Sequence, residues 1–254
     1  MNYFAHPSAA ERYARDRPYF HPLVIERVRA FLKLDGPVPV ALDVACGTGM
    51  STLALTKIAT AVIGADISPA MLSQASAHPR IRYLEAPAEH LPLEDHSVDL
   101  ITVFLAFHWL DRTRFLAEAH RILRPGGTLV ICHHGFQGKM KENPDFTRWC
   151  RDIYYPRFPT PPRHKEPLTD EDARRYGLTV AGHERYTYDI VYTPEQFIRQ
   201  QNTHSNVIAQ VEQGSETLEE TSAWALETVR PFFVASTGTF PFGGEILYLQ
   251  PVSA

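Results

Sequence analysis

The 254-residue sequence has neither a long hydrophobic run nor an excess of basic residues. No apolar stretch approaches the roughly 20 residues that a membrane-spanning helix needs, and residues 1–18 are too polar for a secretory signal peptide. The formal net charge of −4 gives no electrostatic basis for binding nucleic acid or an anionic membrane. We therefore expect a cytoplasmic monomer or homodimer that acts on a small-molecule substrate, not on nucleic acid or a membrane.

Cysteine is also scarce. Cys46, Cys132 and Cys150 are odd in number, and their spacing matches neither a disulfide framework nor a zinc site. We expect three reduced thiols and no metal. The apolar content of 44% and the charged content of 21% are ordinary for a globular protein that buries a large core.

Short apolar runs alternate with helix-like segments through the first half of the chain. Strands are predicted at 39–45, 61–65, 81–84, 98–105 and 127–132, with helices at about 50–58, 69–77 and 112–123. Ser68 and Pro69 are expected to cap and begin the second helix, and Pro125, Gly126 and Gly127 to end the third helix and begin the fifth strand. This alternation predicts an α/β fold, with a doubly wound, Rossmann-like parallel sheet covered on both faces.

The second half is less regular. Residues 135–177 are rich in proline and aromatics and suggest an insertion over one end of the sheet. A strand is predicted at about 181–192, helices at 194–202 and 216–230, and a last strand at 244–250, which would complete a seven-stranded, mostly parallel sheet with an antiparallel final strand and helical lid insertions. The expected segments are an arm at 1–35, a core at 36–134, a lid at 135–178 and the last strands with a helical substrate-side insertion at 179–254.

The stretch from Val40 to Met50, VALDVACGTGM, combines an apolar strand, an acid and a glycine-rich turn. Gly47 and Gly49 allow backbone conformations that side chains forbid, and a helix follows directly. Unpaired amides at the start of that helix would face a ligand, an arrangement that suits nucleotides. We expect a nucleotide-type cofactor here, with Asp43 bracing the turn through backbone amides.

A second acid, Asp66, ends the second predicted strand 23 residues after Asp43. Dinucleotide-binding folds place an acid there on the ribose hydroxyls, because a carboxylate accepts from both hydroxyls at once. The alternative is that Asp66 only caps the next helix. Since Ser68 already fills that role, we favour the ribose contact.

Four motifs in a fixed order now carry a family resemblance. DVACGTG is followed by ADIS, by APAEHLPLEDHSVDLITVFLAFHWL and by RILRPGGTLVI. With them, roughly residues 37–133 resemble the class I S-adenosylmethionine-dependent methyltransferases of the type 11 domain kind. Ala45 stands where the usual turn has its first glycine, a mild departure. The resemblance implies a methyltransferase whose cofactor is S-adenosyl-L-methionine.

The resemblance also implies roles for single residues. Asp43 and the turn would hold the methionine moiety, and Asp66 the ribose. Ile67 and Met71 would flank the adenine, Ala88 and Glu89 would reach its edge, and the segment from Phe107 to Trp109 would lie under the sulfonium and face substrate. The implied cofactor-binding set is Asp43, Ala45, Cys46, Gly47, Thr48, Gly49, Asp66, Ile67, Met71, Ala88, Glu89 and Phe107.

The outer segments ERYARDRPYFHP and TPEQFIRQQNTHSNV are similar to the trans-aconitate methyltransferase-like subgroup, whose N-terminal arm folds over the cofactor. That likeness makes Arg17 a candidate for the cofactor carboxylate and makes Tyr13 and Tyr19 candidates to close the site. Ordinary packing of an amphipathic arm explains the two tyrosines equally well.

Methyl transfer needs a positioned donor and acceptor in a dry site, and a base only if the nucleophile carries a proton. His108 is the first candidate for that catalytic role, because it follows the fourth strand directly. His133, His134 and His204 are weaker candidates, for which polar contacts in loops are the more ordinary explanation. We expect Tyr19, Trp109, His133 and His204 on the substrate side.

The aromatics of the expected lid have two explanations, an apolar substrate chamber or the lid's own core. Four arginines lie among them and are candidates to pair a substrate carboxylate, although solvated surface positions explain most of them: Arg148, Arg151, Arg157 and Arg163.

Two other functions stay open. An NAD-dependent oxidoreductase is disfavoured because Thr52 occupies the third position of G-x-G-x-x-G, where close helix packing wants glycine. A scaffold that binds S-adenosylmethionine without transferring its methyl group remains, because fold and cofactor site do not dictate the reaction. For transfer itself, O- or carboxyl-methylation is expected ahead of C- or N-methylation.

Overall fold

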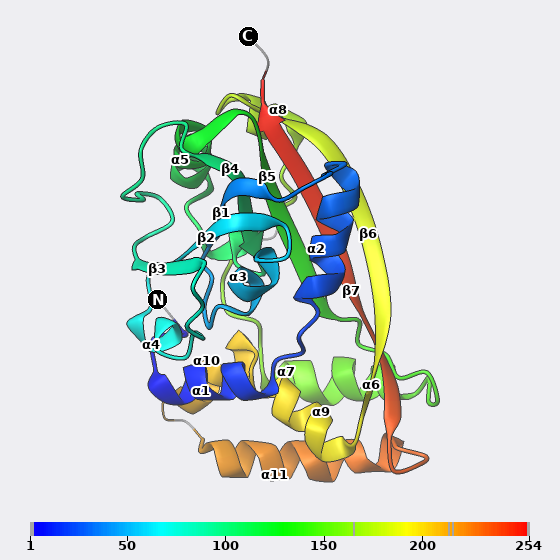
Figure 1. Ribbon diagram of the computed structural model, residues 1–254. Coiled ribbons are helices and arrows are strands. Elements are labelled where there is room, and N and C mark those ends of the chain that lie inside the picture. Colours follow the sequence, from blue (N-terminus) through cyan, green and yellow to red (C-terminus); the bar gives the residue numbers. More distant parts are fainter. Residues whose placement is uncertain (1–2, 165, 213, 215, 253–254) are drawn as a thin grey trace. The chain divides into compact units, whose positions relative to one another are not determined.

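Seven strands form one sheet in the order β3-β2-β1-β4-β5-β7-β6 in the computed structural model, which describes residues 3–164, 166–212, 214 and 216–252 (Figure 1). The sheet is parallel from β3 to β5 and antiparallel at its final strands, so the predicted seven-stranded, doubly wound α/β fold is confirmed. The strands are β1 (Val38–Val44), β2 (Ala59–Asp66), β3 (Ile81–Glu85), β4 (Val98–Phe104), β5 (Leu123–Phe136), β6 (Leu178–Tyr192) and β7 (Gly238–Pro251).

The strand order fixes where a ligand can bind. Strand β1 lies between β2 and β4, so the chain leaves β1 toward one edge of the sheet and later returns to its other side. Such a switch point opens a crevice beyond the carboxyl ends of the strands. Asp43, Asp66 and Phe104 all lie at those ends.

Helices connect the strands, with short 3₁₀ and π segments between some of them. The helices are α1 (Pro7–Asp16), α2 (His21–Phe31), α3 (Met50–Leu55), α4 (Pro69–Leu72), α5 (Arg112–Ile122), α6 (Phe146–Arg148), α7 (Tyr155–Arg157), α8 (Asp170–Arg174), α9 (Pro194–Gln201), α10 (Ser205–Glu212) and α11 (Leu218–Val229), and the short segments are η1 (Phe107–Trp109), η2 (Trp149–Tyr154) and η3 (Arg230–Phe232).

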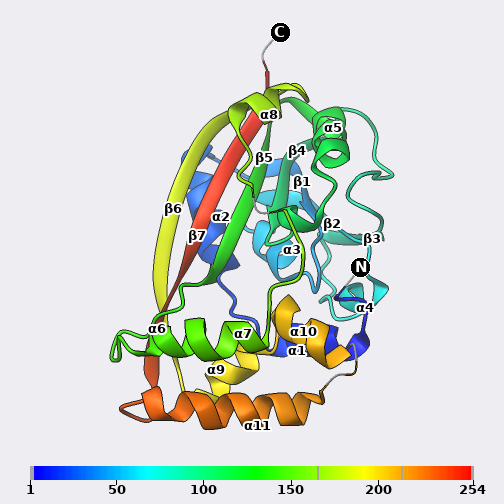
Figure 2. The same cartoon turned by 180° about the vertical axis from the view of Figure 1, so that it is seen from behind.

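The chain divides into two compact units. Unit 1 comprises residues 1–18, 134–162 and 186–244, and unit 2 comprises residues 19–133, 163–185 and 245–254. Unit 2 has a core of aliphatic side chains from β1, β4 and β5. Helices α2 and α3 contact each other on one face of its strands, and α5 covers the opposite face (Figures 1 and 2).

Unit 1 has an aromatic core. Phe146, Trp149 and Phe197 are fully buried in it and contact one another with ring centroids 5.5–6.1 Å apart. Helix α9 contacts both α1 and α11, and Arg12 of α1 donates to Glu212 of α10 at 2.8 Å. The lid aromatics therefore form the unit's own core, which was one of the two explanations that the sequence allowed.

Several element boundaries differ from the prediction: α3 ends at Leu55 instead of about residue 58, and β7 begins at Gly238 instead of residue 244. Helix α4 ends at Leu72 instead of about residue 77, because Ser73 turns its hydroxyl back to the carbonyl of Ala70 at 2.8 Å in a serine-rich stretch that favours turns. Strand β5 begins at Leu123, so Pro125 and Gly126 lie inside the strand, where the pairing with β4 shifts register. A bulge absorbs the left-handed Gly126, at φ 81°.

Candidate functional site

The glycine turn after β1 is held in left-handed conformations. Ala45, Gly47 and Gly49 have φ of 52°, 55° and 74°. A Cβ at Gly47 would lie 2.9 Å from the terminal methyl of Met71, and one at Gly49 would collide with the hydroxyl of Tyr83. The turn needs glycine at both positions for conformation and for space.

Asp43 is fully buried beneath this turn and accepts three hydrogen bonds from hydroxyl groups. Ser51 and Thr52 of α3 donate to one carboxylate oxygen at 2.6 and 2.7 Å, and Thr102 of β4 donates to the other at 2.8 Å. Burial nevertheless raises the pKa of Asp43 to about 6. The expected bonds from backbone amides are therefore wrong for Asp43, which ties α3 to the sheet through hydroxyls.

Asp66 takes the amide of the turn instead. One carboxylate oxygen accepts the Gly47 N–H and the other accepts the Ser68 N–H, both at 2.8 Å. The Ser68 hydroxyl caps α4 by accepting the Met71 N–H at 3.3 Å, as expected. The backbone N–H of Ile67 also acts on this carboxylate, and burial of the side chain raises its pKa. Asp66 thus fixes the turn through backbone amides.

Two further features of the turn fit a nucleoside cofactor. Thr48 is only 5% exposed, and its hydroxyl has no hydrogen-bond partner within the described part of the chain. Buried polar groups normally have such a partner. Ile67, beside Asp66, is 60% exposed, which is unusual for isoleucine and suits a partner with a flat apolar face. An orphaned hydroxyl, a glycine cradle and an exposed apolar flank are together features that a nucleoside ligand can use.

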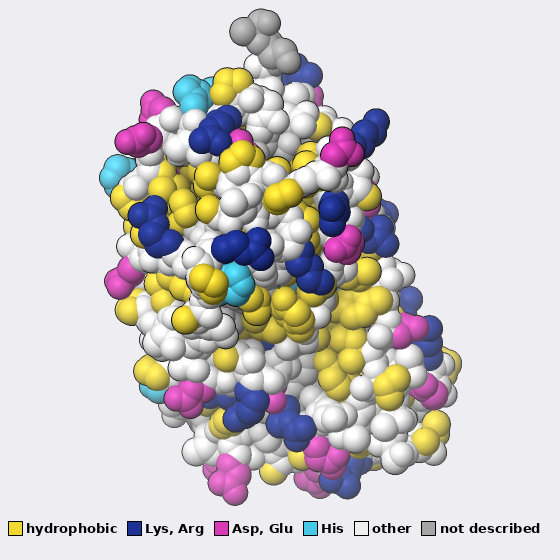
Figure 3. All heavy atoms as spheres, in the orientation of Figure 1, with side chains coloured by type: hydrophobic (Ala, Val, Ile, Leu, Met, Phe, Trp, Pro, Cys, Tyr) yellow, Lys and Arg dark blue, Asp and Glu magenta, His cyan; other side chains and the backbone are white. Residues whose placement is uncertain are grey.

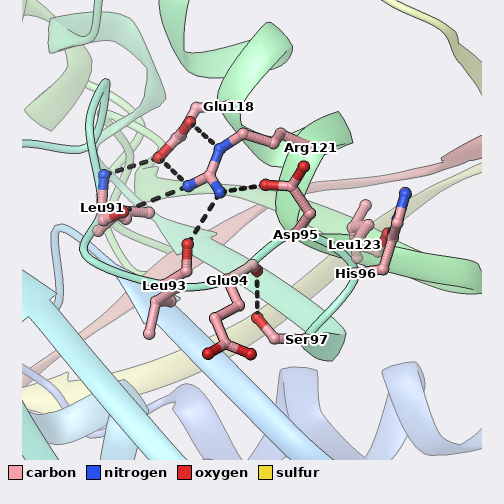
Figure 4. A network of polar contacts seen from close by, with 9 residues as sticks. All are labelled: Leu91, Leu93, Glu94, Asp95, His96, Ser97, Glu118, Arg121 and Leu123. Carbon is pink, nitrogen blue, oxygen red and sulfur yellow. Dashed lines mark hydrogen bonds and ion pairs between the residues drawn. The ribbon is translucent and has the colours of Figure 1, made fainter.

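A polar network braces the loop between β3 and β4 that carries Ala88 and Glu89 (Figure 4). Glu118 of α5 accepts the Leu91 N–H at 2.7 Å and holds the Arg121 guanidinium through both carboxylate oxygens at 2.8 Å. Arg121 also donates to the carbonyls of Leu91 and Leu93 and to Asp95. The loop is therefore anchored to α5 through its backbone.

Glu89 is engaged at the opposite, N-terminal end of α5. Its carboxylate accepts the Asp111 N–H at 2.9 Å, while Asp111 caps α5 by accepting the Arg114 N–H at 3.2 Å. Ala88 is buried. Both residues lie where the sequence predicts the adenine edge, with Glu89 held by a backbone contact.

The segment after β4 forms a second cluster. Leu105 has a left-handed φ of 60°, which turns the chain into η1. Phe107 is buried against Phe115 in the core of unit 2. The His108 Nε2 atom lies 3.5 Å from an Nη atom of Arg163. The ring centroids of His108 and His133 are 6.4 Å apart.

Burial and positive neighbours keep these histidines neutral. Desolvation, followed by the charge of Arg163, lowers the pKa of His108 to about 3. Desolvation also lowers the pKa of His133, whereas Glu245 raises it and Arg112 and Arg163 lower it further. At neutral pH both imidazoles are uncharged, so they can accept hydrogen bonds but are weak bases.

Comparison with known proteins connects this geometry to a family. A family model described as a methyltransferase domain matches residues 42–131, which contain the glycine turn, Asp66 and the segment after β4. Residues 42–131 of the chain are thus similar to a methyltransferase domain. The narrower likeness to the trans-aconitate subgroup stays a prediction.

Individual relatives resemble part of the chain. An uncharacterised methyltransferase of Mycobacterium bovis is 37% identical over 125 residues, 49% of either chain. A malonyl-[acyl-carrier protein] O-methyltransferase of Dechloromonas aromatica is 44% identical over 96 residues, 37% of this chain and 36% of the relative. The chain thus matches about half, or less, of the length of these curated relatives.

The fold likeness extends further. The solved structure of a putative type II methyltransferase from Anaeromyxobacter dehalogenans superposes with a TM-score of 0.69 over 93% of this chain and 97% of the other, at 23% identity. At this identity the match concerns the methyltransferase fold alone.

Several residues predicted for the methyltransferase site lie together in unit 2. These are Asp43, Ala45, Cys46, Gly47, Thr48, Gly49, Asp66, Ile67 and Met71 at the turn, Ala88 and Glu89 on the braced loop, Phe107, His108 and Trp109 after β4, and His133, which lies within β5 because that strand continues to Phe136. Burial raises the pKa of the Cys46 thiol, so this cysteine is unreactive at neutral pH. All three cysteines are free and buried, which confirms the expected thiols.

Other candidates belong to unit 1. Arg17 lies over the ring of Tyr13, 4.9 Å from its centroid, and His204 contacts Gln200 at 3.0 Å. His134 lies between the hydroxyls of Tyr186 and Tyr188, each 3.2 Å from one ring nitrogen. The roles of Arg17 and His204 stay predictions, and the contacts of His134 support a polar structural role.

Two residues near the carboxyl ends of the strands escaped the sequence analysis. Tyr83 of β3 is paired in register with Gly64 and covers the turn, a pattern detectable only once strands are aligned. His21 is buried, stacks on Phe20 at 4.3 Å and meets Phe104 edge-on at 5.2 Å. Tyr19, which was predicted, is 48% exposed beside His21.

The surface adds little to the site. On the face seen in Figure 3, basic and acidic side chains are interspersed, without a continuous field of either sign. Within the described ranges, no helix has the length and apolarity to cross a membrane. The described residues also include no cluster of three or more histidine, cysteine or acidic side chains placed to hold a metal ion.

Proposed function

We propose that this protein transfers a methyl group from S-adenosylmethionine to a small-molecule acceptor, at a carboxylate or hydroxyl oxygen ahead of carbon or nitrogen. The observation that carries the proposal is the cradle at the switch point. There, Asp66 holds the amide of Gly47, and the orphaned Thr48 hydroxyl lies in the same turn. A malonyl-[acyl-carrier protein] O-methyltransferase among the relatives supports transfer to oxygen.

In this proposal, the carboxylate of Asp66 accepts from the ribose hydroxyls. Thr48 and the turn receive the amino-acid part, with Arg17 of the N-terminal arm as a candidate for its carboxylate. Exposed Ile67 covers the adenine, whose edge faces Ala88 and Glu89. Each assignment uses a donor, acceptor or surface that the chain leaves available.

The bound cofactor would supply a methyl carbon carried on a sulfonium. The acceptor's electron pair would form a bond to that carbon, the C–S bond would break, and sulfur would leave as a neutral thioether. The protein's part is to hold the acceptor in line and exclude water. Trp109, His133 and Tyr19 would provide the acceptor-side walls, with His204 a further candidate. Neutral His108 would orient the acceptor by accepting a hydrogen bond, and its low pKa makes it a poor base toward a hydroxyl.

The oxidoreductase alternative is weaker. Thr52 is fully buried and donates to Asp43, so a side chain fills the position where a dinucleotide site needs glycine. A scaffold that binds the cofactor without transfer shares every cofactor contact, so only turnover separates it from the enzyme.

Labelled turnover tests the proposal. The purified protein is incubated with S-adenosylmethionine carrying a ¹³C methyl group and a small-molecule metabolite extract, and products are read by mass spectrometry. We expect a labelled small molecule and one S-adenosylhomocysteine per label. Cofactor binding without any label would favour the scaffold.

A matched variant tests the acceptor side. His108→Ala should lower turnover of the labelled acceptor at least tenfold while changing the S-adenosylhomocysteine affinity less than threefold, because His108 is assigned to the acceptor. His120→Ala, on α5, is the control. Full turnover by His108→Ala would leave the reaction to positioning by other groups.

A further inference from the structure

Arg163 differs from most arginines of the chain because no acid neutralises it. Ion pairs occupy Arg12, Arg15, Arg27, Arg114, Arg121, Arg124, Arg148, Arg151, Arg157, Arg174, Arg175, Arg199 and Arg230. Arg163 has no carboxylate within ion-pair distance among the described residues. Arg163 contacts two residues of the segment after β4. It lies beside the imidazole of His108, and its guanidinium carbon lies 5.9 Å from the ring centroid of Trp109.

The backbone holds the Arg163 segment against η1. The His164 N–H donates to the His108 carbonyl at 3.1 Å, and Arg112 donates to the Glu166 carbonyl at 2.6 Å. Both bonds involve residues that directly or closely follow Arg163 in the chain. Its position beside His108 is therefore built into the fold of unit 2 and does not depend on the side chain alone.

A second guanidinium adds to the positive charge. Arg112 lies 4.8 Å from the centroid of the Phe107 ring, and both arginines act electrostatically on His108 and His133. Two cations and two uncharged imidazoles thus converge on the acceptor side of the turn. Glu245 acts on His133, and Asp172 and Glu166 act on Arg112, so Arg163 is the cation of this cluster that favours an anionic ligand.

We propose that Arg163 binds a carboxylate of the methyl acceptor and so sets its specificity; the proposal rests on the function proposed above. A guanidinium presents a planar fork that a carboxylate matches with two parallel hydrogen bonds. Trp109 flanks the fork, and His108 lies within reach as a neutral partner.

The neutral histidine is consistent with this acceptor class. An imidazole whose conjugate acid is so acidic removes a proton from a hydroxyl poorly. A carboxylate already carries its electron pair at neutral pH and needs no base. The same site could methylate the bound carboxylate or a second oxygen of the acceptor, and the anion contact is common to both.

Ligand-observed NMR tests the site with defined probes. The protein is first titrated with S-adenosylhomocysteine by calorimetry, then saturated with it and mixed with succinate or with uncharged succinamide. We expect saturable binding of succinate, little of succinamide, and at least tenfold weaker succinate binding by Arg163→Gln. Arg163→Lys keeps the charge without the fork and should fall between.

Arg82→Gln is the control, because Arg82 is exposed on β3 and the substitution changes the net charge equally. Circular dichroism verifies that every variant is folded. Equal succinate binding by Arg163→Gln and the parent protein, equal binding of succinamide, or no succinate binding would each overturn the inference. Failure to bind S-adenosylhomocysteine would instead contradict the function proposed above.

Discussion

At the scale of single residues, backbone strain gathers beside the glycine turn and the segment after β4. Ala45 and Leu105 both have a left-handed φ, and each is the residue immediately after a central strand, β1 or β4. Non-glycine residues adopt this conformation at a cost of about 1 kcal/mol or more, and they persist where the surroundings over-determine them. Ala45 therefore adds backbone strain to the turn as well as a methyl group.

Ala45→Gly should raise the free energy of unfolding by about 1 kcal/mol, because glycine relieves the left-handed strain. Urea denaturation followed by circular dichroism measures it. Ala70→Gly, inside α4, is the control and should lower stability instead. A loss of stability in Ala45→Gly would mean that the methyl group contributes more through packing than it costs in strain.

Asp43 gives a pH dependence with a defined sign. Burial raises its pKa to about 6, whereas an unfolded aspartate titrates near 4. Between these values the folded state keeps a proton that the unfolded chain has lost, so the contribution of Asp43 falls as pH rises from about 4 to 6. The expected size is about 3 kcal/mol.

Asp43→Asn removes this ionisation, and its unfolding free energy should fall less over that pH range than that of the parent protein. Chemical denaturation at half-unit pH steps measures the difference, with exposed Asp35→Asn as the control. Identical pH profiles for the parent protein and Asp43→Asn would place the titration elsewhere.

Much of the site was predictable at this scale, because its residues are near one another in sequence. The glycine spacing and the acids at the carboxyl ends of β1 and β2 predicted the turn. Their partners were not predictable. That Asp43 takes hydroxyls while Asp66 takes the Gly47 amide depends on how α3 and β4 approach in space.

At the scale of elements, the loop before β4 depends on α5 for its position. Glu118 and Arg121 hold its backbone, and Ala88 and Glu89 lie at its start (Figure 4). The sequence showed the loop motif but not this anchor, because the two segments are about thirty residues apart and contact only through side chains and carbonyls.

Arg121→Gln should lower the free energy of unfolding by about 2 kcal/mol, because the largely buried Glu118 loses its charged partner. It should also weaken S-adenosylhomocysteine binding several-fold by loosening the loop. Denaturation and calorimetry check the two effects. Arg175→Gln, which removes an exposed ion pair to Glu171, should change neither. If Arg121→Gln lowers stability but leaves the S-adenosylhomocysteine affinity unchanged, the network stabilises the fold without contributing to cofactor binding.

At the scale of the whole molecule, local pattern predicted all seven strands but carries no signal of which distant segments share one core. Alternating strands and helices over 36–134 follow from periodicity and turn residues. Unit 1 instead combines residues 1–18, 134–162 and 186–244 around one aromatic core. Contacts between such distant segments leave no periodic signal, so the sequence could not decide between a substrate chamber and a core.

Isothermal titration calorimetry with S-adenosylmethionine, S-adenosylhomocysteine and NAD tests the central claim most directly. We predict saturable binding of the first two, no binding of NAD, and at least tenfold weaker binding by Asp66→Ala, since each charge-assisted hydrogen bond contributes roughly 1.5–3 kcal/mol. Binding of NAD without the sulfonium cofactor, or undiminished affinity in Asp66→Ala, would contradict the account.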